Sequence, residues 1–538
     1  MKIKKLLIKN YKIFRNRYIQ LNDNVNIFVG DNDSGKSTIL EALSIVTCCR
    51  LNGVGLDRQL TVNLFNIAVR LEYIESIING SPVAPPSIEI EAYCEKSDEY
   101  ASLQGTNNSC TEDCPGVKMM IEFDSEYSAA YKTLLTQKNV FDIPLEFYKI
   151  RYLSFKGEPI NWRSTPFRVA HIDTSKKDYG NVINRFVSEN VSSYLSESEQ
   201  IDLRVAYRKN HSSFKSNEIV ARLNKTIEES IKLADKKVSI GIREEGLDEW
   251  KNQLSIAVDD IPFEYIGVGS QNVVKVELVL KNEDADTNIL LIEEPENNLS
   301  YSNMSKLISK IQRNSDKQVF ISTHSSFVAN KLGLSNLFII AAGNVSPLTA
   351  LNIEAMNYFK KLPGYDTLRL VIATRVILVE GPTEELLVQR AYFDLNGKLP
   401  IEDGVDVIVV DSLAFKRYCD LAILINKDVA VITDNDGDIQ KNINEKYSDY
   451  ARNANIRIFY EADIHLRTVE PCVLDVNSQT TDDFTNFRKA ISKKNSHMND
   501  SKDDILSFMQ KNKTEWSMRV FDFPDKIKYP LYILDAIK

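Results

Sequence analysis

The sequence predicts an α/β protein in which each half of the chain builds a parallel β-sheet. In the first half, largely apolar runs at 25–29 and 289–292 lead directly into Gly-rich or acidic segments, and the runs at 376–379 and 429–432 do the same in the second half. Apolar runs this short, bounded by Gly or Asp, are typical of strands buried in a parallel sheet. Because α/β folds place their ligand sites at the carboxyl ends of such strands, we expect the polar residues after each run to form sites.

Length and composition limit the class of protein. A chain of 538 residues is too long for one hydrophobic core, so we expect two or three domains. The apolar content of 43% and the charged content of 26% are those of an ordinary soluble globular protein, and the net charge of -9 makes it mildly acidic. An acidic balance does not exclude nucleic acid as a partner, since Lys and Arg residues can gather in a local groove.

The cysteines and the apolar stretches indicate the compartment. The seven cysteines form no CxxC pair, and Cys110 and Cys114 lack a second pair of ligands at zinc spacing, so we expect reduced thiols. The segment MKIKKLLIKNYKIF has an apolar run too short for a signal peptide or a membrane anchor. No apolar stretch approaches the roughly 20 residues that span a bilayer. We therefore expect a soluble, cytoplasmic protein with no membrane partner.

A phosphate-binding loop follows the first predicted strand. Residues 25–38 read VNIFVGDNDSGKST, in which a strand leads into the pattern G-x-x-x-x-G-K-S and the helix ILEALSIV begins at once. In this context backbone N–H groups cradle phosphates, Lys36 reaches the β- and γ-phosphates and Ser37 ligates Mg²⁺. A Gly-rich turn that matches by chance is the alternative. The predicted ATP-binding residues of the loop are Gly30, Asp31, Asn32, Ser34, Gly35, Lys36, Ser37 and Thr38.

Two later segments carry residues that hydrolysis of a nucleotide needs. The run at 289–292 ends in adjacent acids, of which we expect Glu293 to hold the Mg²⁺ shell and Glu294 to orient or deprotonate the attacking water. A solvated turn is the alternative for these acids. The next predicted strand, QVFIST, ends in a polar cluster that contains His324. An isolated histidine is more often structural, but this one lies a helix and a strand after the paired acids.

The segment between these motifs has two parts. Alternating apolar residues in PSIEIEAYC, GVKMMIEF and FYKIRYLSF predict antiparallel strands beside the nucleotide site. From about 175 to 258 the chain becomes polar and helical, above all from Asn217 to Lys237. We interpret this part as a compact helical insertion that serves self-association, and a solvated helical lid is the alternative.

The second half carries its own set of acids. Glu380 follows the run at 376–379 with Glu384 four residues later, and Asp434 and Asp436 follow the run at 429–432. Carboxylates crowded in this way repel one another unless a cation lies between them, so the pattern indicates a divalent metal site. Two metals at such a site clamp the attacking and leaving oxygens of a phosphodiester.

Structural alternatives exist for some of these acids. Thr383 can cap a helix that begins near it, and Glu384 then needs no metal because it complements the helix dipole. Asp434 and Asp436 fit an Asx-rich turn or a calcium loop, although such a loop needs a Gly at position 6 as well as an acid at Glu445. A purely structural role is weakest for Glu380, because a carboxylate at the end of a buried strand needs a partner such as a cation.

The order of elements in the first half resembles the ABC-type ATPase head of SMC, RecF and related proteins. The resemblance implies a signature loop that contacts the γ-phosphate held by a second protomer, and FEYIGVGSQ is the matching segment, with Ser270 and Gln271. This segment departs from the LSGGQ-like pattern of the family. The resemblance also implies that His324 senses the γ-phosphate, that 298–300 form the D-loop, and that two heads enclose ATP in at least a dimer.

The segments VILVEGPTEELLV and VAVITDNDGD resemble the TOPRIM domain of type II topoisomerases, primases and some nucleases. Behind an ABC-type head, this domain resembles the overcoming-lysogenisation-defect (OLD) nuclease family, which includes the nuclease subunit of the Gabija anti-phage system. The resemblance implies that Glu380, Glu384, Asp434 and Asp436 bind Mg²⁺ or Mn²⁺, and that Glu470 in RTVEPCVL adds a further ligand.

The same resemblance implies a catalytic lysine near the C-terminus that stabilises charge on the scissile phosphate. Lys513 in KNKTEWSM is our candidate, and Lys511, Lys526 and Lys528 compete with it. His465 and His497 have no partner pattern and receive no role.

These observations predict an ABC-type ATPase head, split by a helical insertion, followed by a TOPRIM-like α/β domain with a parallel sheet. The expected segments are the first part of the head (1–174), the insertion (175–258), the second part of the head (259–345), a linker (346–370) and the TOPRIM domain (371–538).

The leading hypothesis is an ATP-regulated, metal-dependent DNA endonuclease that acts as a dimer or tetramer. The resemblance implies phage defence in a bacterial cytoplasm, with a helicase-like partner. The alternatives are an ATP-dependent DNA-binding protein whose TOPRIM-like fold is an interaction module, and an ATPase that serves DNA repair. The complete acidic set favours the nuclease.

Overall fold

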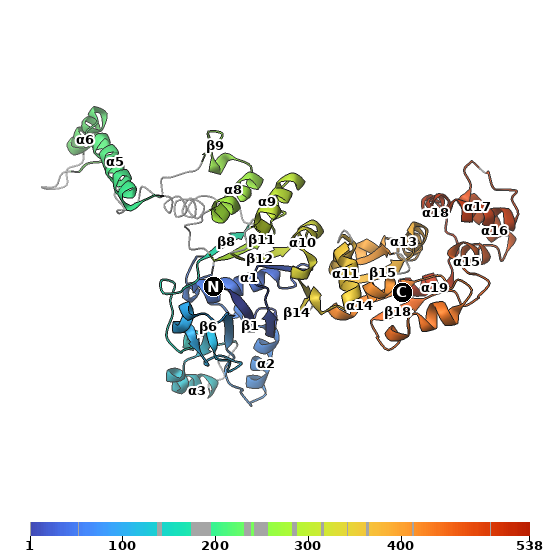
Figure 1. Ribbon diagram of the computed structural model, residues 1–538, viewed down its shortest axis with the longest axis horizontal. Coiled ribbons are helices and arrows are strands. Elements are labelled where there is room, and N and C mark those ends of the chain that lie inside the picture. The colour runs from blue at the N-terminus through green and yellow to red at the C-terminus, as the bar shows by residue number, and fades with distance from the viewer. Residues whose placement is uncertain are drawn as a thin grey trace.

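The computed structural model describes residues 2–51, 53–136, 142–173, 195–230, 238–240, 257–281, 288–313, 317–341, 343–361, 365–410, 414–494 and 496–538. These residues form a larger part that contains the N-terminus and a smaller part that contains the C-terminus (Figure 1). Within the described ranges, no helix is long and apolar enough to cross a membrane.

An antiparallel sheet forms one layer of the larger part. Its strand order is β2-β1-β4-β6-β5, and β7 also pairs with β6. The three segments whose alternation predicted antiparallel strands are β4, β6 and β7, so that prediction is confirmed. The bounds are Ile3–Tyr11 (β1), Phe14–Gln20 (β2), Ile88–Cys94 (β4), Gln104–Gly105 (β5), Cys114–Phe123 (β6) and Tyr148–Ser154 (β7).

A second sheet carries the strands of the predicted nucleotide site. Its order is β14-β13-β3-β12-β11-β8, and all neighbours are parallel except the edge strand β14. Every residue of β3, β11 and β12 is buried, which explains why these segments read as short apolar runs. The bounds are Val25–Gly30 (β3), Val169–Asp173 (β8), Ile289–Glu293 (β11), Gln318–Thr323 (β12), Leu337–Ala341 (β13) and Asn344–Pro347 (β14).

Helix α1 (Lys36–Cys48) lies between these two sheets. Its apolar residues Ile39 and Leu40 share a core with Phe28 and Phe320 of the parallel sheet and with Ile90 of the antiparallel sheet. The other helices of this part are α2 (Ile67–Ile78), α3 (Ser128–Thr136), α8 (Val268–Lys281), α9 (Tyr301–Arg313) and α10 (Ser326–Leu332). A short hairpin of β9 (Ala257–Val258) and β10 (Ile261–Pro262) precedes α8.

Part of the expected helical insertion is described. It contains α5 (Glu197–Lys215) and α6 (Glu218–Ser230), which contact each other. Ser196 caps α5 through a capping box with Glu199, which fixes where that helix begins. Residues 174–194, 231–237 and 241–256 of this region lie outside the described residues.

The smaller part contains a four-stranded sheet in which all strands are parallel, as the acid-ended runs predict. Its order is β16-β15-β17-β18, with bounds Arg375–Val379 (β15), Val405–Val409 (β16), Asp428–Ile432 (β17) and Ile456–Phe459 (β18). The surrounding helices are α13 (Pro382–Asn396), α14 (Phe415–Ile425), α15 (Val469–Val476), α16 (Thr481–Ile491), α17 (Lys502–Lys511), α18 (Lys513–Asp522) and α19 (Leu531–Ile537).

The two parts share one hydrophobic core. Side chains alternate along β15, so that Val376 and Leu378 join the core of the ATP-site sheet while Ile377 and Val379 face α13 and the C-terminal helices. Helices α11 (Ile353–Lys361) and α12 (Tyr365–Ile372) link the parts, and α12 contacts both β3 and β16. The strand that precedes the phosphate-binding loop is therefore packed, through one helix, against the sheet that carries the acids.

Candidate nucleotide and metal sites

The phosphate-binding loop closes around the side chain of Lys36. Its Nζ donates hydrogen bonds to the carbonyl oxygens of Gly30 (3.0 Å) and Asp31 (2.7 Å). Burial lowers the pKa of Lys36, and the charge of Glu294 opposes that shift. Gly35 has φ 110°, and a Cβ there would lie 2.8 Å from Ile13, so the loop needs glycine at this turn. The loop thus presents a buried cation at a helix N-terminus, an arrangement that suits phosphate.

A cavity of about 400 Å³ joins this loop to the acids after β11. Asn32, Lys36, Ser37, Glu294 and His324 are among its lining residues. His324 Nε2 lies 3.5 Å from Glu294 Oε1. Burial lowers the pKa of His324, and the nearby charge of Lys36 adds to the effect, which favours the neutral imidazole. The residues that sequence motifs placed together are therefore neighbours in this cavity.

The paired acids have different surroundings. Glu294 has φ 47°, a conformation that glutamate seldom adopts and that costs about 1–3 kcal/mol. Its side chain faces the cavity and accepts a hydrogen bond from Asn297 Nδ2 at 2.7 Å. Glu293 is buried at the end of β11, where its Oε1 lies 2.9 Å from Nε2 of His171 on β8. Strain of this kind gathers at functional sites, and here it turns the second acid toward the phosphate-binding loop.

The segment expected to form a signature loop begins a helix. Gly269, Ser270 and Gln271 lie in the first turn of α8, and Gln271 Nε2 donates to the carbonyl oxygens of Phe263 (3.0 Å) and Ile266 (3.1 Å). A Cβ on Gly269 would lie only 2.0 Å from the carbonyl oxygen of Asn298. The helix start therefore packs directly on the expected D-loop. Among the described residues, the 400 Å³ cavity is lined by neither Ser270 nor Gln271.

Acidic side chains gather at the carboxyl edge of the four-stranded sheet. Glu380 follows β15, and its Oε1 accepts hydrogen bonds from Thr433 Oγ1 (2.7 Å) and from the backbone N–H of Asp434 (3.2 Å). These bonds join the ends of two neighbouring strands. Glu384 lies one turn into α13.

The expected cap of α13 is wrong. Gly381 is the N-cap, Pro382 begins the helix, and Thr383 is buried in the first turn without a capping bond. The physical reason is that proline is preorganised for the first helical position, so the helix begins two residues earlier than a threonine cap requires.

The turn that carries the aspartates is anchored by Asn435. This buried side chain donates through Nδ2 to three carbonyl oxygens of the segment 461–466, and its Oδ1 accepts from the N–H of Gly437. Asp434 is half-buried, whereas Asp436 is exposed at φ 49°. Residues after the turn form a π-helical segment, Gln440–Glu445, so Glu445 belongs to a helix rather than to a calcium loop.

Burial and neighbouring carboxylates raise the pKa values of Asp434 and Glu384. Burial raises the pKa of Asp434 to about 8, and the charges of Glu380, Glu384, Glu470 and Asp436 add to the shift. Burial also raises the pKa of Glu384 to about 7, with further contributions from Glu470 and Glu380. Carboxylates from separate segments of the chain therefore share one electrostatic environment.

The donor set fits a divalent cation. Oxygen ligands suit Mg²⁺ and Mn²⁺, and Glu470 is only 1% exposed while, among the described residues, its Oε1 has no hydrogen-bond partner. Within the described ranges, however, no three Asp, Glu, His or Cys side chains are grouped to hold a metal ion. Mutual repulsion keeps like charges apart, and a cation between them would remove that repulsion.

One of the four candidate lysines lies at this cluster. Lys513, at the start of α18, places Nζ 3.6 Å from Glu470 Oε1, and its side chain is 61% exposed. Lys526 instead donates to a carbonyl oxygen of α13, and Lys528 pairs with Asp483 at 2.7 Å. The structure therefore brings an accessible cation to the acids.

Sequence reasoning missed three side chains of these sites. His171 contacts Glu293, and no motif marks it. Glu296, the last acid of EEPE, accepts hydrogen bonds from Thr323 Oγ1 and from the backbone N–H of His324, each at 2.7 Å. A third acid within this four-residue segment could have marked Glu296 as a site residue. The exposed Arg467 lies against the aspartate turn, where a Cβ on Gly437 would be 3.0 Å from its Nε.

Comparison with known proteins gives the family. Residues 1–329 match the family described as AAA ATPase domain, which is more than half of the chain. The chain belongs to this family. Residues 372–436 match the TOPRIM domain described as overcoming lysogenization defect protein-like. The resemblance to the OLD architecture, an ATPase domain followed by a TOPRIM domain, is thereby confirmed.

A search of solved structures matched an SMC head domain from Thermotoga maritima at 16% sequence identity and a TM-score of 0.31. The match covers 65% of this chain and 99% of that one. The recombination mediator protein RecF bound to ATP matched at 13% identity and a TM-score of 0.33. That match covers 64% of this chain and 99% of the RecF chain. An Smc head domain derived from Pyrococcus furiosus matched at 12% identity and a TM-score of 0.32. That match covers 64% of this chain and 95% of the Smc chain. A search of curated proteins found no match.

Proposed function

We propose that this protein is an ATP-regulated, metal-dependent DNA endonuclease. The observation that carries the proposal is the gathering of Glu380, Glu384, Asp434 and Glu470, with Lys513, at the carboxyl edge of the TOPRIM sheet. Four buried or half-buried carboxylates beside an exposed lysine are costly to maintain in a protein that has no cation to bind. The chain's two family matches support this assignment.

The acids would hold the divalent metal, with Glu380, Asp434 and Asp436 as the central ligands and Glu384 and Glu470 beside them. Mg²⁺ or Mn²⁺ bound there would activate water and stabilise charge on the phosphodiester oxygens. Glu380 keeps the ends of β15 and β17 together through Thr433 and Asp434. Lys513, which is exposed, would approach the DNA strand and offset the charge that builds on the scissile phosphate.

The ATPase domain would regulate this site. Lys36 and the loop would bind the phosphates of ATP, and Ser37 with Glu293 would hold its Mg²⁺. Glu294 would orient the attacking water, while His324, next to Glu294, would report the γ-phosphate. Nucleotide binding would shift the TOPRIM site between conformations through the core that the two parts share.

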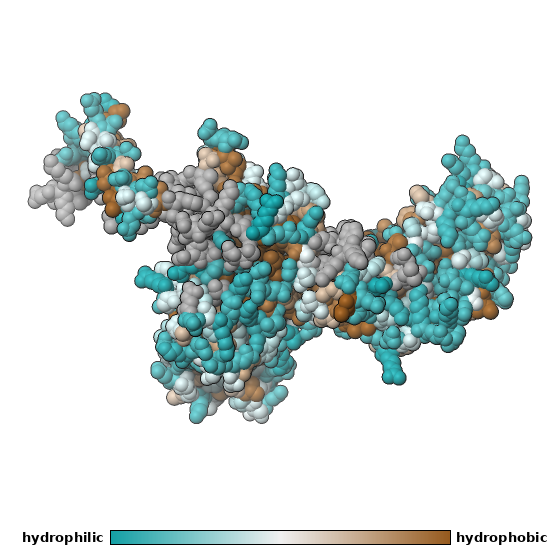
Figure 2. All heavy atoms as spheres, in the orientation of Figure 1, coloured by the Kyte–Doolittle hydropathy of each residue, from teal (hydrophilic) through white to brown (hydrophobic). Residues whose placement is uncertain are grey.

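A second copy of the chain is the proposed partner of helices α5 and α6. Figure 2 shows apolar side chains on the surface of these helices, and the exposed ones include Ile201, Phe214, Ile219 and Leu223. Exposed apolar side chains on neighbouring helices favour burial against another protein surface. Ser270 and Gln271 would then act on ATP held by the opposite copy, in a dimer or a tetramer.

A plasmid assay tests the nuclease. The wild-type protein is incubated with supercoiled plasmid, Mg²⁺ or Mn²⁺, and a range of ATP concentrations. Asp434→Ala/Asp436→Ala should abolish cleavage. The control Asp438→Ala should retain it, because Asp438 lies in the same turn and its side chain accepts a hydrogen bond from the N–H of Lys441. Intact plasmid throughout, with ATP still hydrolysed, would favour an ATP-dependent DNA-binding or repair protein whose TOPRIM domain is an interaction module.

We extend the proposal to bacterial antiviral defence in the cytoplasm, with a helicase-like partner protein. Plaque counts on cells that carry the wild-type gene or the Asp434→Ala/Asp436→Ala variant test this role. Equal plaque counts with and without the predicted helicase-like partner would contradict it.

A further inference from the structure

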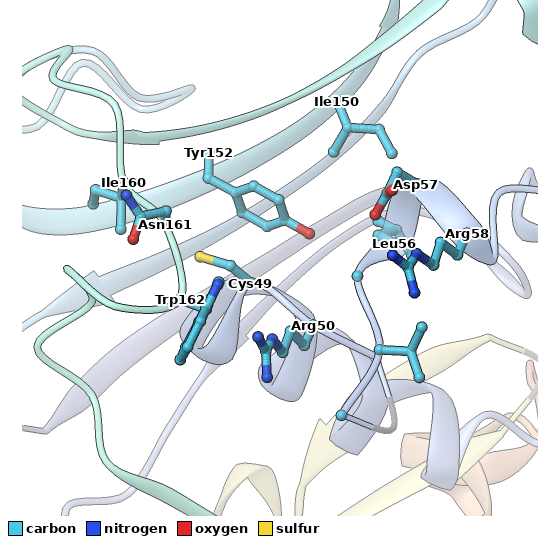
Figure 3. A pocket seen from close by; sticks show the side chains of 13 residues that line it. Cys49, Arg50, Leu56, Asp57, Arg58, Ile150, Tyr152, Ile160, Asn161 and Trp162 are labelled. Carbon is cyan, nitrogen blue, oxygen red and sulfur yellow. The ribbon is translucent and has the colours of Figure 1, made fainter. Parts of the chain in front are cut away.

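A second cavity lies at the far end of α1 from the phosphate-binding loop. Its volume is about 520 Å³, and it is formed by the turn after α1, by β7 and by the segment that follows it (Figure 3). The side chains that matter for its chemistry are Arg50, Arg58, Tyr152 and Trp162. This volume is in the range of about 300–1,000 Å³ that small-molecule sites occupy.

The Trp162 ring and the Arg50 guanidinium form one wall of the cavity, and Arg163 lies next to the ring outside the lining. Arg50 Cζ lies 3.9 Å from the centroid of the Trp162 ring, and Arg163 Cζ lies 4.7 Å from it. Trp162 is nevertheless 46% exposed. Its backbone is fixed in a turn, because Asn161 Oδ1 accepts hydrogen bonds from the N–H groups of Arg163 and Ser164. Stacked indole and guanidinium planes of this kind are platforms for nucleobases.

Among the described residues, no carboxylate forms an ion pair with the arginines at this cavity. Among the described residues, none of Arg50, Arg58 and Arg163 has a carboxylate oxygen within 4.0 Å. Asp57 is the acid in the lining, and its Oδ1 is folded back onto Gly55, where a Cβ would lie 2.3 Å from it. Guanidinium groups without carboxylate partners favour an anionic ligand, and their planar donor geometry matches phosphate.

A buried hydroxyl lies in the lining of this cavity. The hydroxyl oxygen of Tyr152 is inaccessible to solvent and has no hydrogen-bond partner within the described part of the chain. Figure 3 shows the ring of Tyr152 beside Cys49. Binding that rearranged the lining would give this hydroxyl the hydrogen-bond partner that it lacks among the described residues.

This cavity is separate from the ATP site. The lining of the 400 Å³ cavity begins at the N-terminal end of α1, whereas Cys49 and Arg50 follow its C-terminal end. The 13 residues of α1 span about 20 Å at 1.5 Å per residue, and the two cavities share no lining residue. One molecule of ATP at the phosphate-binding loop does not account for both.

We propose that this cavity binds a second nucleotide, with its base on the Trp162 and Arg50 stack and its phosphate at Arg58. A free nucleotide and an unpaired nucleotide of a DNA strand both offer this chemistry. Either ligand would contact the turn after the C-terminal end of α1, and Lys36 lies at the N-terminal end of the same helix. The site would thus report nucleotide or single-stranded DNA to the ATPase domain.

The test measures nucleotide binding in EDTA by the full-length Lys36→Ala variant. This substitution weakens ATP binding at the phosphate-binding loop, so that binding at the second cavity can be measured. Two probes are used in separate titrations, fluorescently labelled ATP and a 5′-labelled oligothymidylate, followed by anisotropy. Adding Trp162→Ala should weaken binding of the true ligand about 10-fold or more, since base stacking on an aromatic ring contributes that much. Trp162→Phe should restore most of the affinity, and Arg58→Met should weaken it again.

The matched control is Arg15→Met, which removes an exposed arginine of the same domain that pairs with Glu72. It should leave both titrations unchanged. Sensitivity of the ATP titration alone to Trp162→Ala identifies a free nucleotide, and sensitivity of the oligonucleotide titration alone identifies a DNA strand. If neither probe binds, or if Trp162→Ala and Arg58→Met leave both affinities unchanged while melting temperatures match, the proposal is overturned. Failure of plasmid cleavage would not affect this result, because binding is the readout.

Discussion

Lys513 Nζ lies 3.6 Å from Glu470 Oε1, although helices α16 and α17 separate the two residues in the sequence. Glu470 is buried in the first turn of α15, and its other oxygen accepts a hydrogen bond from Thr468 Oγ1 at 2.7 Å. The contact places an exposed cation beside the one Glu470 oxygen that lacks a hydrogen-bond partner among the described residues. It ties α18 to the acid cluster and gives this lysine a position that its competitors do not share.

The first prediction concerns this lysine. Lys513→Met should lower the rate of DNA cleavage about 100-fold, the loss typical of removing one group that stabilises transition-state charge, with little change in DNA binding. Lys528→Met is the control, because Lys528 pairs with Asp483 instead. Initial nicking rates at saturating Mg²⁺ measure the effect. An equal loss of cleavage rate in both variants would contradict the assignment of Lys513 as the catalytic lysine.

The second prediction concerns the repulsion within the acid cluster. Asp434→Asn should raise the melting temperature at pH 7 in EDTA by about 2 °C or more, because the raised pKa of Asp434 makes folding take up a proton or bury a charge, and asparagine needs neither. It should also reduce the further rise that Mg²⁺ causes in the wild type, since a cation stabilises only a folded state that binds it. Thermal unfolding with EDTA and with Mg²⁺ measures both changes. Asp438→Asn should behave like the wild type, and a matching shift in that control would contradict the prediction.

The sequence predicted the strands of the parallel sheets well because buried strands appear in it as continuous apolar runs. Glu293 and Glu380 were found because each follows such a run directly, and Asp434 because it lies two residues after one. Positions set by tertiary packing were not readable in the same way. Lys513 was the candidate lysine but its competitors stayed open, and His171 carries no motif, because both acquire their neighbours from segments far away in the chain. The start of α13 was misplaced since local chemistry offered two competing signals.

The third prediction tests His171 as a positioning residue for Glu293. His171→Ala should raise the Mg²⁺ concentration needed for half-maximal ATP hydrolysis about 10-fold or more, because partners that orient a metal ligand contribute that much to affinity. The rate at saturating Mg²⁺ should change less. His497→Ala is the control, as that histidine pairs with Asp500 in the TOPRIM part. A lower maximal rate with an unchanged Mg²⁺ requirement would argue against the positioning role.

The fourth prediction concerns the contact between Gly269 and the D-loop. Gly269→Ala places a methyl group 2.0 Å from the carbonyl oxygen of Asn298, so the start of α8 or the D-loop must move. We expect a loss of about 1–3 kcal/mol in stability and reduced ATP hydrolysis. Gly267→Ala is a close control, because its Cβ would meet nothing within 4 Å. Unfolding curves and hydrolysis rates that are the same for both variants would show that the contact is absent in solution.

The fifth prediction concerns communication between the two sites. Lys427 precedes β17, the strand that leads to Asp434, and its Nζ donates hydrogen bonds to the carbonyl oxygens of Val371 (3.1 Å) and Ala373 at the end of α12. Burial lowers the pKa of Lys427, and the charge of Asp31 in the phosphate-binding loop opposes that shift, so the lysine lies within electrostatic reach of the ATP site. It therefore joins the helix that packs on β3 to the strand that carries the acids.

Lys427→Met should weaken the effect of ATP on DNA cleavage, since it removes both the charge near Asp31 and the bonds that hold α12 to β17. Cleavage without nucleotide and the ATP hydrolysis rate should change little, because Lys427 contacts neither reacting group. Lys416→Met serves as the control, as this lysine of α14 is paired with Asp449 at 3.8 Å and is solvent-exposed. Plasmid cleavage is measured across ATP concentrations for all three proteins. A Lys427→Met curve that follows the wild type at every ATP concentration would mean that the signal travels by another route through the shared core.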